Sequence, residues 1–262
     1  MLKIQNVQKT FFAGTVNERT ALANIDLELA AGEFLTVIGS NGAGKSTLLN
    51  MVSGKLRPDT GSVVIDGRDV TRLQDHQRAR YIGRVFQDPM AGSAPQLSIE
   101  QNMSIAYERG KTRGLGWGVS AKKRELFREE LKSLELGLEG RLKSKVGLLS
   151  GGQRQALSLL MATFSEPKIL LLDEHTAALD PQRAALVSRL TGEIVQRHRL
   201  TTLMVTHNMQ QALDLGTRLV MMHEGRIILD LDSAQKAEMT VPDLLHEFEK
   251  IKGSLDDRTM LQ

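Results

Sequence analysis

Apolar positions follow two patterns along the chain, strand-like runs and helix-like faces. Residues 24–29 place isoleucine or leucine at every second position, which predicts a strand buried on one face. Further strands are predicted at residues 2–7, 34–38, 61–66, 81–86, 169–172, 201–205 and 219–222. Helices are predicted to begin at Lys45 and Pro181, and to cover residues 121–136 and 241–252, where apolar residues recur at helical spacing. Strands that alternate with helices predict an α/β fold with a mostly parallel sheet.

Composition narrows the class of protein. The 262 residues are 41% hydrophobic and 25% charged, which is typical of a globular protein. Cysteine is absent, which excludes a disulfide framework and a thiolate metal site. No run of 18 apolar residues occurs, and the first residues lack the apolar core of a signal peptide. We therefore expect a cytoplasmic protein without a membrane-spanning segment.

The middle of the chain differs from its flanks. Residues 108–145 hold eleven basic and six acidic residues, a net charge of +5. They include few aromatic residues, so we expect a solvated face near lipid headgroups or a membrane partner, and no specific nucleic-acid binding. We expect one domain over 1–262, with a core at 1–88 and 165–230, a helical subdomain at 89–164 and a C-terminal helical tail at 231–262. Trp117, the only tryptophan, could contact a partner or fill a local gap.

A phosphate-binding loop is predicted where the third strand ends. Residues 39–46 read Gly-Ser-Asn-Gly-Ala-Gly-Lys-Ser and match the pattern GxxxxGK[ST] in full, between a predicted strand and a predicted helix. Glycines let the backbone wrap around a phosphate, and the amides at a helix N-terminus attract anions. Lys45 adds a charge for the β- and γ-phosphates of ATP, and the Ser46 hydroxyl can bind Mg²⁺. The candidate ATP-binding residues are Ser40, Asn41, Gly42, Ala43, Gly44, Lys45, Ser46 and Thr47.

Two carboxylates follow the buried strand at 169–172. Ligands of open α/β sheets bind at the carboxyl ends of strands, where Asp173 and Glu174 lie. Asp173 is a candidate magnesium ligand that acts through water, and Glu174 a candidate general base that takes a proton from the attacking water. Alone this pair is a weak signal, because solvated acids often follow a strand. Beside a complete phosphate loop it favours nucleotide hydrolysis.

A second glycine-rich helix start separates this chain from other phosphate-loop proteins. Residues 149–153 read Leu-Ser-Gly-Gly-Gln, which is the signature of ABC ATPases, and the chain resembles that family along nearly its whole length. Further matches follow in the family's order: Gln87, Asp180, the switch histidine His207, and Phe11 as the adenine-stacking aromatic, with Phe12 as a competitor. The resemblance adds the nucleotide-contacting candidates Phe11, Gln87, Ser150, Gly151, Gly152, Gln153 and Asp180, the magnesium contact Gln87, and the catalytic candidate His207 beside Glu174.

The resemblance implies a fold and an activity. The fold is a phosphate-loop ATPase core with an N-terminal antiparallel β portion and a helical subdomain. In the family, Ser150 and its neighbours would serve the ATP of a second copy, so the resemblance implies a homodimer that uses ATP and Mg²⁺. It also implies separate transmembrane permease subunits, a substrate-binding protein, and a place on the inner face of the plasma membrane. The string at residues 173–180 resembles ATPases of import systems, some for amino acids, although His175 stands where the family commonly has proline.

Other classes of protein explain the sequence less well. A kinase or a GTPase leaves the Leu-Ser-Gly-Gly-Gln segment unexplained. Soluble ABC ATPases without a transport role are an alternative, of the iron–sulfur assembly type or associated with nucleic acid. Relatives in DNA repair carry long heptad insertions that this sequence lacks, and ribosome-binding relatives usually carry two cassettes. The iron–sulfur assembly type stays open on sequence grounds.

Overall fold

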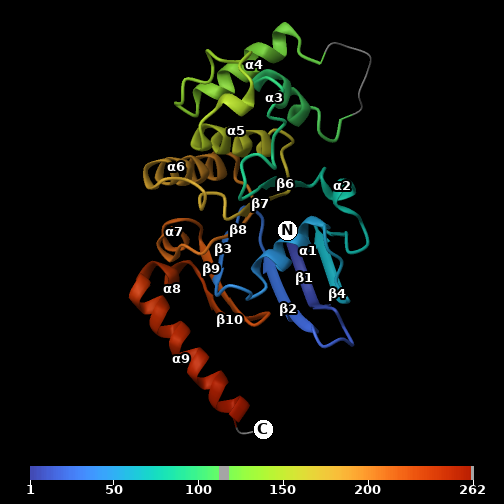
Figure 1. The fold of residues 1–262 in the computed structure, drawn as a ribbon, viewed down its shortest axis with the longest axis vertical. Coiled ribbons are helices and arrows are strands. Elements are labelled where there is room, and N and C mark those ends of the chain that lie inside the picture. The colour runs from blue at the N-terminus through green and yellow to red at the C-terminus, as the bar shows by residue number, and fades with distance from the viewer. Residues whose placement is uncertain (112–117, 261–262) are drawn as a thin grey trace.

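The computed structural model describes residues 1–111 and 118–260, with side chains described as far as residue 250. Trp117, interpreted above as a partner contact or a local filler, lies outside the described residues. Among the described residues, no helix combines the length and the apolar character needed to cross a membrane. Figure 1 shows β-sheets in the lower half of the view, a group of helices at the top, and a long C-terminal helix extending from the sheet end.

A six-stranded mixed sheet forms the centre of the fold. Its strand order is β10-β9-β3-β8-β7-β6, and every neighbouring pair is parallel except β9 and β10. The strands are β3 (Phe34–Gly39), β6 (Ile82–Val85), β7 (Ile169–Asp173), β8 (Thr202–Val205), β9 (Arg218–His223) and β10 (Arg226–Leu231). The mostly parallel sheet is confirmed. Strand β10 was missed by the sequence patterns; it returns from β9 through the two-residue turn at Glu224 and Gly225.

A second sheet is antiparallel and has the order β2-β1-β4-β5. Its strands are β1 (Leu2–Phe11), β2 (Arg19–Leu29), β4 (Thr60–Ile65) and β5 (Arg68–Asp69). This is the antiparallel β portion that the family resemblance implied. Strands β1 and β2 run further than the sequence predicted, because their ends at Phe11 and Arg19 pair beyond the buried part, where no apolar alternation marks them.

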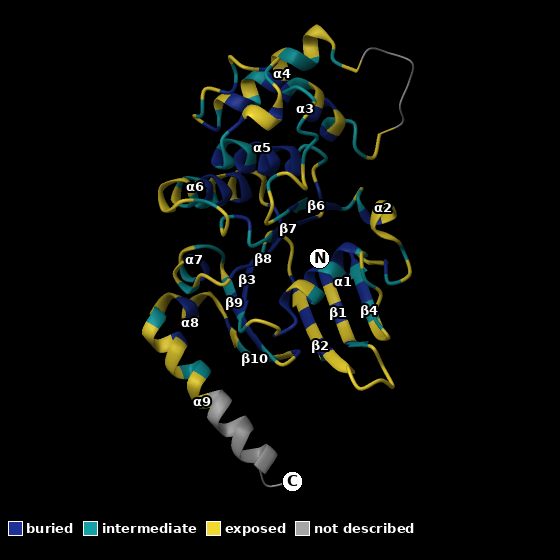
Figure 2. Cartoon of the chain, in the orientation of Figure 1, coloured by how far each residue is buried: buried dark blue, intermediate teal, exposed yellow. Residues whose placement is uncertain are grey.

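The strand β7 is buried on both faces, as its continuous apolar run predicted. Ile169 and Leu171 pack into one cluster with α1 (Lys45–Ser53) and the antiparallel sheet. Leu170 and Leu172 point the other way, into a cluster with α5 (Gly151–Thr163) and α6 (Pro181–His198). Figure 2 shows this burial as dark blue along α5 and the inner strands. The central sheet is therefore a rigid base for the loops that leave its carboxyl edge.

The helical part lies between β6 and β7 in the chain. It holds α3 (Ile99–Tyr107), α4 (Ala121–Lys132), the 3₁₀ turn η1 (Val146–Leu148) and α5. Helix α4 buries Phe127 and Leu131, and it ends four residues before the predicted boundary, shortly before Glu135 adopts a left-handed conformation at φ 55°. The remaining helices are α2 (Asp75–Arg78), α7 (Met209–Asp214), α8 (Ser233–Glu238) and α9 (Val241–Met260). The amphipathic tail helix is confirmed in α9, where Leu244 is buried.

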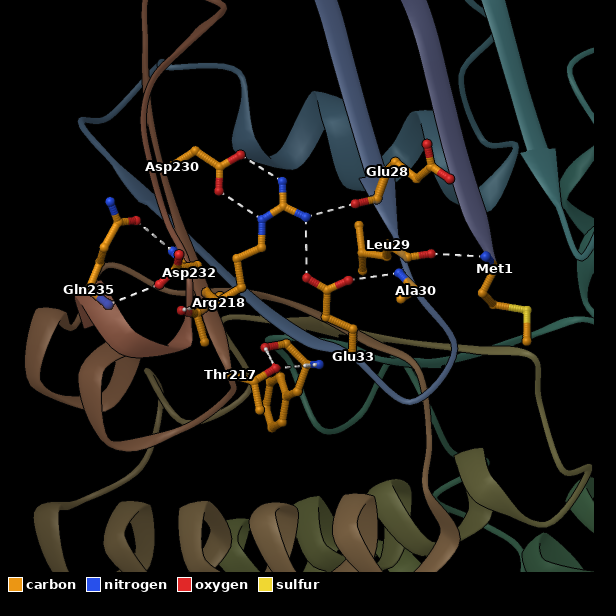
Figure 3. Close-up of polar contacts among 12 residues, drawn as sticks. Met1, Glu28, Leu29, Ala30, Glu33, Thr217, Arg218, Asp230, Asp232 and Gln235 are labelled. Carbon is orange, nitrogen blue, oxygen red and sulfur yellow. Dashed lines mark hydrogen bonds and ion pairs between the residues drawn. The ribbon is translucent and has the colours of Figure 1, made fainter. Parts of the chain in front are cut away.

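A cluster of charged residues connects the central sheet, at β9 and β10, to the antiparallel sheet, at β2. Arg218 of β9 donates to both carboxylate oxygens of Asp230 in β10, at 2.7 and 2.6 Å. The same guanidinium reaches the Glu28 carbonyl oxygen of β2 at 2.8 Å and the Glu33 carboxylate at 3.2 Å (Figure 3). The Asp230 hydrogen bonds, helped by Glu33, raise the pKa of Arg218. This cluster fixes the antiparallel sheet against the central sheet.

Candidate active site

Four loops with candidate residues leave one edge of the central sheet. The phosphate loop follows β3, His207 lies two residues after β8, Asp173 ends β7, and Gln87 lies two residues after β6. These four strands are neighbours in the order β3-β8-β7-β6 and run parallel, so their carboxyl ends meet at one edge. Ligands of such sheets bind there.

Backbone crowding explains the glycines at both ends of the phosphate loop. Gly39 has a φ of 148°, and a Cβ placed on it would lie 2.1 Å from the Met222 carbonyl oxygen. Gly44, which caps α1, has a φ of 101°, and its Cβ would lie 2.4 Å from the Ala21 carbonyl oxygen. No side chain fits at either position, because the obstacles are backbone atoms. The loop therefore packs against β9 and β2 while its amides lead into the α1 N-terminus.

Lys45 closes the loop from the inside. Its side chain is buried, and its Nζ donates to the carbonyl oxygens of Gly39 and Ser40 at 2.8 and 3.0 Å. Burial lowers the pKa of Lys45, and the negative charge of Glu174 opposes this lowering. Two neutral carbonyl acceptors thus hold the lysine at the loop, and the Glu174 carboxylate is near enough to influence its pKa.

A pocket of about 210 Å³ gathers the phosphate loop, Phe11 and Glu174. Its lining from the loop runs from Asn41 to Thr47. Ser40 does not line the pocket, and its hydroxyl lies 3.2 Å from His223 Nδ1. Phe12 does not line this pocket; it is 70% exposed and adopts a left-handed φ of 55° after β1 ends. Of the two phenylalanines, Phe11 is therefore the one at the phosphate-loop pocket.

Arg19 also lines the pocket, and sequence reasoning missed it. Its Nη2 donates to the Gly42 carbonyl oxygen at 2.8 Å. The residue comes from β2, 23 positions away in the chain. No motif marks such a contact, so the only sequence signal would have been a basic residue near the end of a strand. It adds a cation to a pocket suited to an anionic ligand.

Glu174 and His207 form a contacting pair at the sheet edge. The Nδ1 of His207 lies 3.2 Å from Oε2 of Glu174. Glu174 is held by its backbone amide, which donates to the Val205 carbonyl oxygen at 2.9 Å, and it has a φ of 43°. Its side chain also lines a second pocket of about 630 Å³, with His207, Leu179 and Pro181. Glu174 therefore faces both the phosphate-loop pocket and the segment before α6.

The second glycine-rich helix start does not line the phosphate-loop pocket. Ser150 caps α5: its hydroxyl accepts from the Gln153 amide at 3.3 Å, while Gln153 Oε1 accepts from the Ser150 amide at 3.2 Å. Gly151 and Gly152 lie against the segment at Leu179 and Arg183, because added Cβ atoms would come within 3.2 and 3.1 Å of those side chains.

Two candidates lie apart from the pocket lining. Asp180 caps α6 by accepting from the Arg183 amide at 3.1 Å, and it also pairs with the Arg183 guanidinium at 3.2 Å. Gln87 is exposed just after β6 and lines neither of the two pockets that hold Glu174. The structure thus brings Phe11, the phosphate loop and Glu174 together, with His207 beside them. Within one chain it leaves Gln87, Asp180 and residues 150–153 outside that pocket.

His175 replaces the family's proline with a buried hydrogen bond. Its Nε2 lies 2.9 Å from the Thr191 hydroxyl of α6, which itself donates to the Val187 carbonyl oxygen at 2.8 Å. Because that hydroxyl already donates to Val187, it accepts from His175, which donates through Nε2. Burial lowers its pKa to about 4. The residue after Glu174 is thereby tied to α6.

The oxygen donors at the pocket suit magnesium. Mg²⁺ keeps several waters and takes few protein oxygens, usually beside the phosphates of a nucleotide. Ser46 supplies a hydroxyl at the pocket wall. Asp173 supplies a carboxylate at the end of β7, which lies two strands from β3 in the sheet. Among the described residues, no cluster of three acidic or histidine side chains forms an all-protein metal cage. These donors fit a metal that is held largely by its nucleotide.

Known proteins share this sequence and this fold. A family model described as ABC transporter matches residues 22–177. The chain belongs to the ABC transporter family. A tyrosine transport ATP-binding protein of Clostridioides difficile (strain R20291) is 43% identical over 249 residues, which are 95% of this chain and 99% of that protein. A methionine import ATP-binding protein of Geobacillus kaustophilus (strain HTA426) is 35% identical over 87% of this chain, which spans 64% of that relative's length.

Solved structures agree with the sequence comparison. A dimeric ATP-binding cassette in a post-hydrolysis state with ADP and Pi superposes with a TM-score of 0.76 at 31% identity, covering 89% of this chain and 99% of that one. The ADP conformation of another cassette has a TM-score of 0.76 at 26% identity, covering 95% and 98%. The chain is thus an ABC transporter ATPase subunit that powers import. The relatives named as import proteins do not favour the soluble alternatives.

Proposed function

We propose that this ABC subunit binds and hydrolyses ATP in two sites, each shared between two copies of the chain. Phe11 would stack on adenine, and residues 40–47 would hold the phosphates. The observation that carries the proposal is the pocket that joins Phe11, the phosphate loop and Glu174, with His207 in contact with Glu174.

The residues at the sheet edge have separable roles in this proposal. Lys45 neutralises the β- and γ-phosphates, and Ser46 and Asp173, with Gln87, would hold magnesium, which supplies charge neutralisation when bound. The Glu174 carboxylate accepts the proton of the attacking water. His207, whose Nδ1 lies 3.2 Å from Oε2 of Glu174, would orient that carboxylate. The left-handed backbone at Glu174, with a φ of 43°, keeps its side chain at the junction of the two pockets.

The position of Ser150 supports sharing between copies. A helix N-terminus with a serine hydroxyl suits a phosphate, yet residues 150–153 do not line the pocket of their own chain. A head-to-tail pair related by a two-fold axis would place the phosphate loop of one copy opposite Ser150 of the other, twice. Leu179 lies against Gly151, and Asp180 follows it in the chain as the N-cap of α6, so the same interface would include both. The dimeric cassette with ADP and Pi supports such a pairing.

A mixing experiment tests the shared site. Lys45→Ala disables the phosphate loop, and Ser150→Arg disables the helix start; each is placed in a Glu174→Gln background to block hydrolysis. Neither homodimer contains an intact site, but a mixed dimer contains one. Light scattering with ATP and Mg²⁺ should show dimer in the mixture above that of either variant alone. Equal dimer in all three samples would mean that Ser150 does not act on its partner's ATP.

The transported solute is proposed to be an amino acid or a close analogue. The support is the tyrosine transport relative, which matches 95% of this chain and 99% of its own length. The homodimer would bind a separate transmembrane permease on the inner face of the plasma membrane, fed by a substrate-binding protein. Purified permease and this chain, reconstituted in vesicles, should take up labelled tyrosine with ATP, and Glu174→Gln should abolish uptake. Uptake of another solute class in the same vesicles would refute the substrate assignment.

A further inference from the structure

Arg84 of β6 is a cation in contact with the candidate magnesium carboxylate. Its Nη2 donates to Oδ2 of Asp173 at 2.7 Å. Both side chains are largely buried, at 14% and 17% exposure. Strand register explains the contact, because Arg84 pairs with Leu171 and Asp173 lies two residues further along β7, on the same face. No sequence pattern indicates this pair, since the two residues are 89 positions apart.

The other branch of the guanidinium is fixed to α1. Nη1 donates to Asn50 Oδ1 at 2.9 Å and to Ser53 Oγ at 3.2 Å. The Cζ atom lies 4.8 Å from the centre of the Phe86 ring, a cation–π distance. Arginine thus bridges α1, which begins at the phosphate loop, to the strand that ends in Asp173. A planar fork with two bonded nitrogens has little freedom to turn.

One nitrogen of this fork has no acceptor. Among the described residues, Arg84 Nε is buried without a hydrogen-bond partner. An unpaired buried donor on a charged group is costly, and packing alone would favour an apolar residue between Ile82 and Val85. The buried Arg84 guanidinium therefore costs folding stability, and its shortest contact is to the carboxylate of Asp173. This pattern indicates a role at the site.

We propose that Arg84 is a positioning residue for the magnesium site, which orients the Asp173 carboxylate toward the metal of bound ATP. The inference rests on the proposed role of Asp173. By holding Oδ2, Arg84 leaves Oδ1 for the metal's water shell. Groups that hydrogen-bond a metal-binding carboxylate typically change metal affinity by about 10- to 100-fold when they are lost.

Two effects of removing Arg84 oppose each other. Loss of a positive charge near a cation site favours the metal, while loss of orientation disfavours it. Arg84→Lys separates them, because lysine keeps the charge but cannot bridge Asp173 to Asn50 and Ser53 at once. If orientation dominates, Arg84→Lys and Arg84→Gln both weaken the metal site. If charge dominates, Arg84→Gln strengthens it and Arg84→Lys leaves it unchanged.

The test measures metal-dependent nucleotide binding rather than turnover. A fluorescent non-hydrolysable ATP analogue is bound to the full chain in EDTA and across a Mg²⁺ titration. Arg84→Lys and Arg84→Gln should raise the Mg²⁺ concentration for half-maximal effect about tenfold. Asn50→Ala removes one acceptor of Nη1 and should raise it about two- to threefold, as loss of one hydrogen bond does. Affinity in EDTA should stay at the wild-type value in Arg84→Lys and Asn50→Ala, which keep the positive charge.

Two further variants separate the possible failures. Arg218→Gln, which breaks the ion pairs of Figure 3 away from the site, is the matched control and should lower the Tm without moving the Mg²⁺ midpoint. Asp173→Asn should abolish the Mg²⁺ effect. If it does not, the proposed role of Asp173 fails and the inference with it. If Asp173→Asn acts as expected but the Arg84 variants keep or lower the midpoint, Arg84 has a structural role alone and the inference is overturned.

Discussion

Acidification should destabilise this protein through one residue, His175. The residue is fully buried, and burial lowers its pKa to about 4 from an ordinary value of 6.5. The unfolded chain therefore binds a proton at a higher pH than the folded chain does. The stability that the neutral side chain contributes is complete above pH 6.5 and is lost as the pH falls from 6.5 toward 4.

The size of the effect follows from the two pKa values. Between pH 7 and pH 5 the folded protein should lose about 2 kcal/mol of unfolding free energy from this group, at 1.36 kcal/mol per pKa unit. For a chain of 262 residues that corresponds to a Tm decrease of roughly 4–8 °C. The Nε2–H bond to Thr191, at 2.9 Å, can persist when the ring is protonated, because the second proton enters at Nδ1. The cost at low pH is therefore that of a buried charge.

Thermal unfolding at pH 7, 6 and 5 measures this contribution. In His175→Gln the side-chain amide can still donate to Thr191 but takes no proton, so the Tm should fall less between pH 7 and pH 5 than in wild type. His76→Gln removes an exposed histidine, 70% accessible, and serves as the matched control with an unchanged slope. An equal pH slope in His175→Gln and wild type would show that His175 does not carry the acid sensitivity.

Four further outcomes are expected. Lys45→Ala should lose tight ATP binding in a fluorescence titration, and wild-type affinity would contradict the phosphate-loop assignment. Glu174→Gln should bind ATP and accumulate as a dimer by light scattering while steady-state hydrolysis becomes very slow; turnover within a few-fold of wild type would mean another base. His207→Ala should lower kcat more than ATP affinity, whereas a loss confined to Tm would make His207 structural. Duplex DNA should bind only weakly and in a salt-sensitive way, and submicromolar affinity at physiological salt would favour the nucleic-acid alternative.

The central sheet was predictable because its signals are local. The run at 169–172 and the phosphate-loop pattern after 34–38 each lie within one strand and the turn that follows it. Strand β10 was missed because five of its six residues are only partly buried or exposed at a sheet edge, where apolar alternation fades. The outer half of β1 was missed for the same reason, whereas the start of β2 buries two adjacent residues, Ala21 and Leu22, and so shows no alternation. A strand shows apolar alternation in its sequence only where one of its faces is buried. Strand β10 and the outer half of β1 have few buried residues.

The candidate site likewise contains residues that the sequence predicts and residues that it does not. The candidate phosphate-binding and proton-accepting residues, such as Lys45 and Glu174, belong to local motifs and could be identified from the sequence. Their supports could not: Arg84 reaches Asp173 across 89 positions, and His223 reaches Ser40 across 183. Such contacts depend on strand order and register, which one sequence does not record. Phe11 was separable from Phe12 only when the end of β1 placed one ring at the pocket and exposed the other.

Charge balance gives a physical reason for a site shared between copies. Lys45, Arg19 and Arg84 supply three cations at or near the phosphate loop, and Asp173 and Glu174 supply two anions, so these five side chains leave a net charge of only +1. A triphosphate entering such a site needs further positive charge, and the α1 N-terminus supplies only part of it. Magnesium and a second helix N-terminus, which residues 150–153 offer outside their own pocket, would supply the rest. Glu174→Gln removes one of the two anions, so it should retain ATP through charge as well as by losing its proton acceptor.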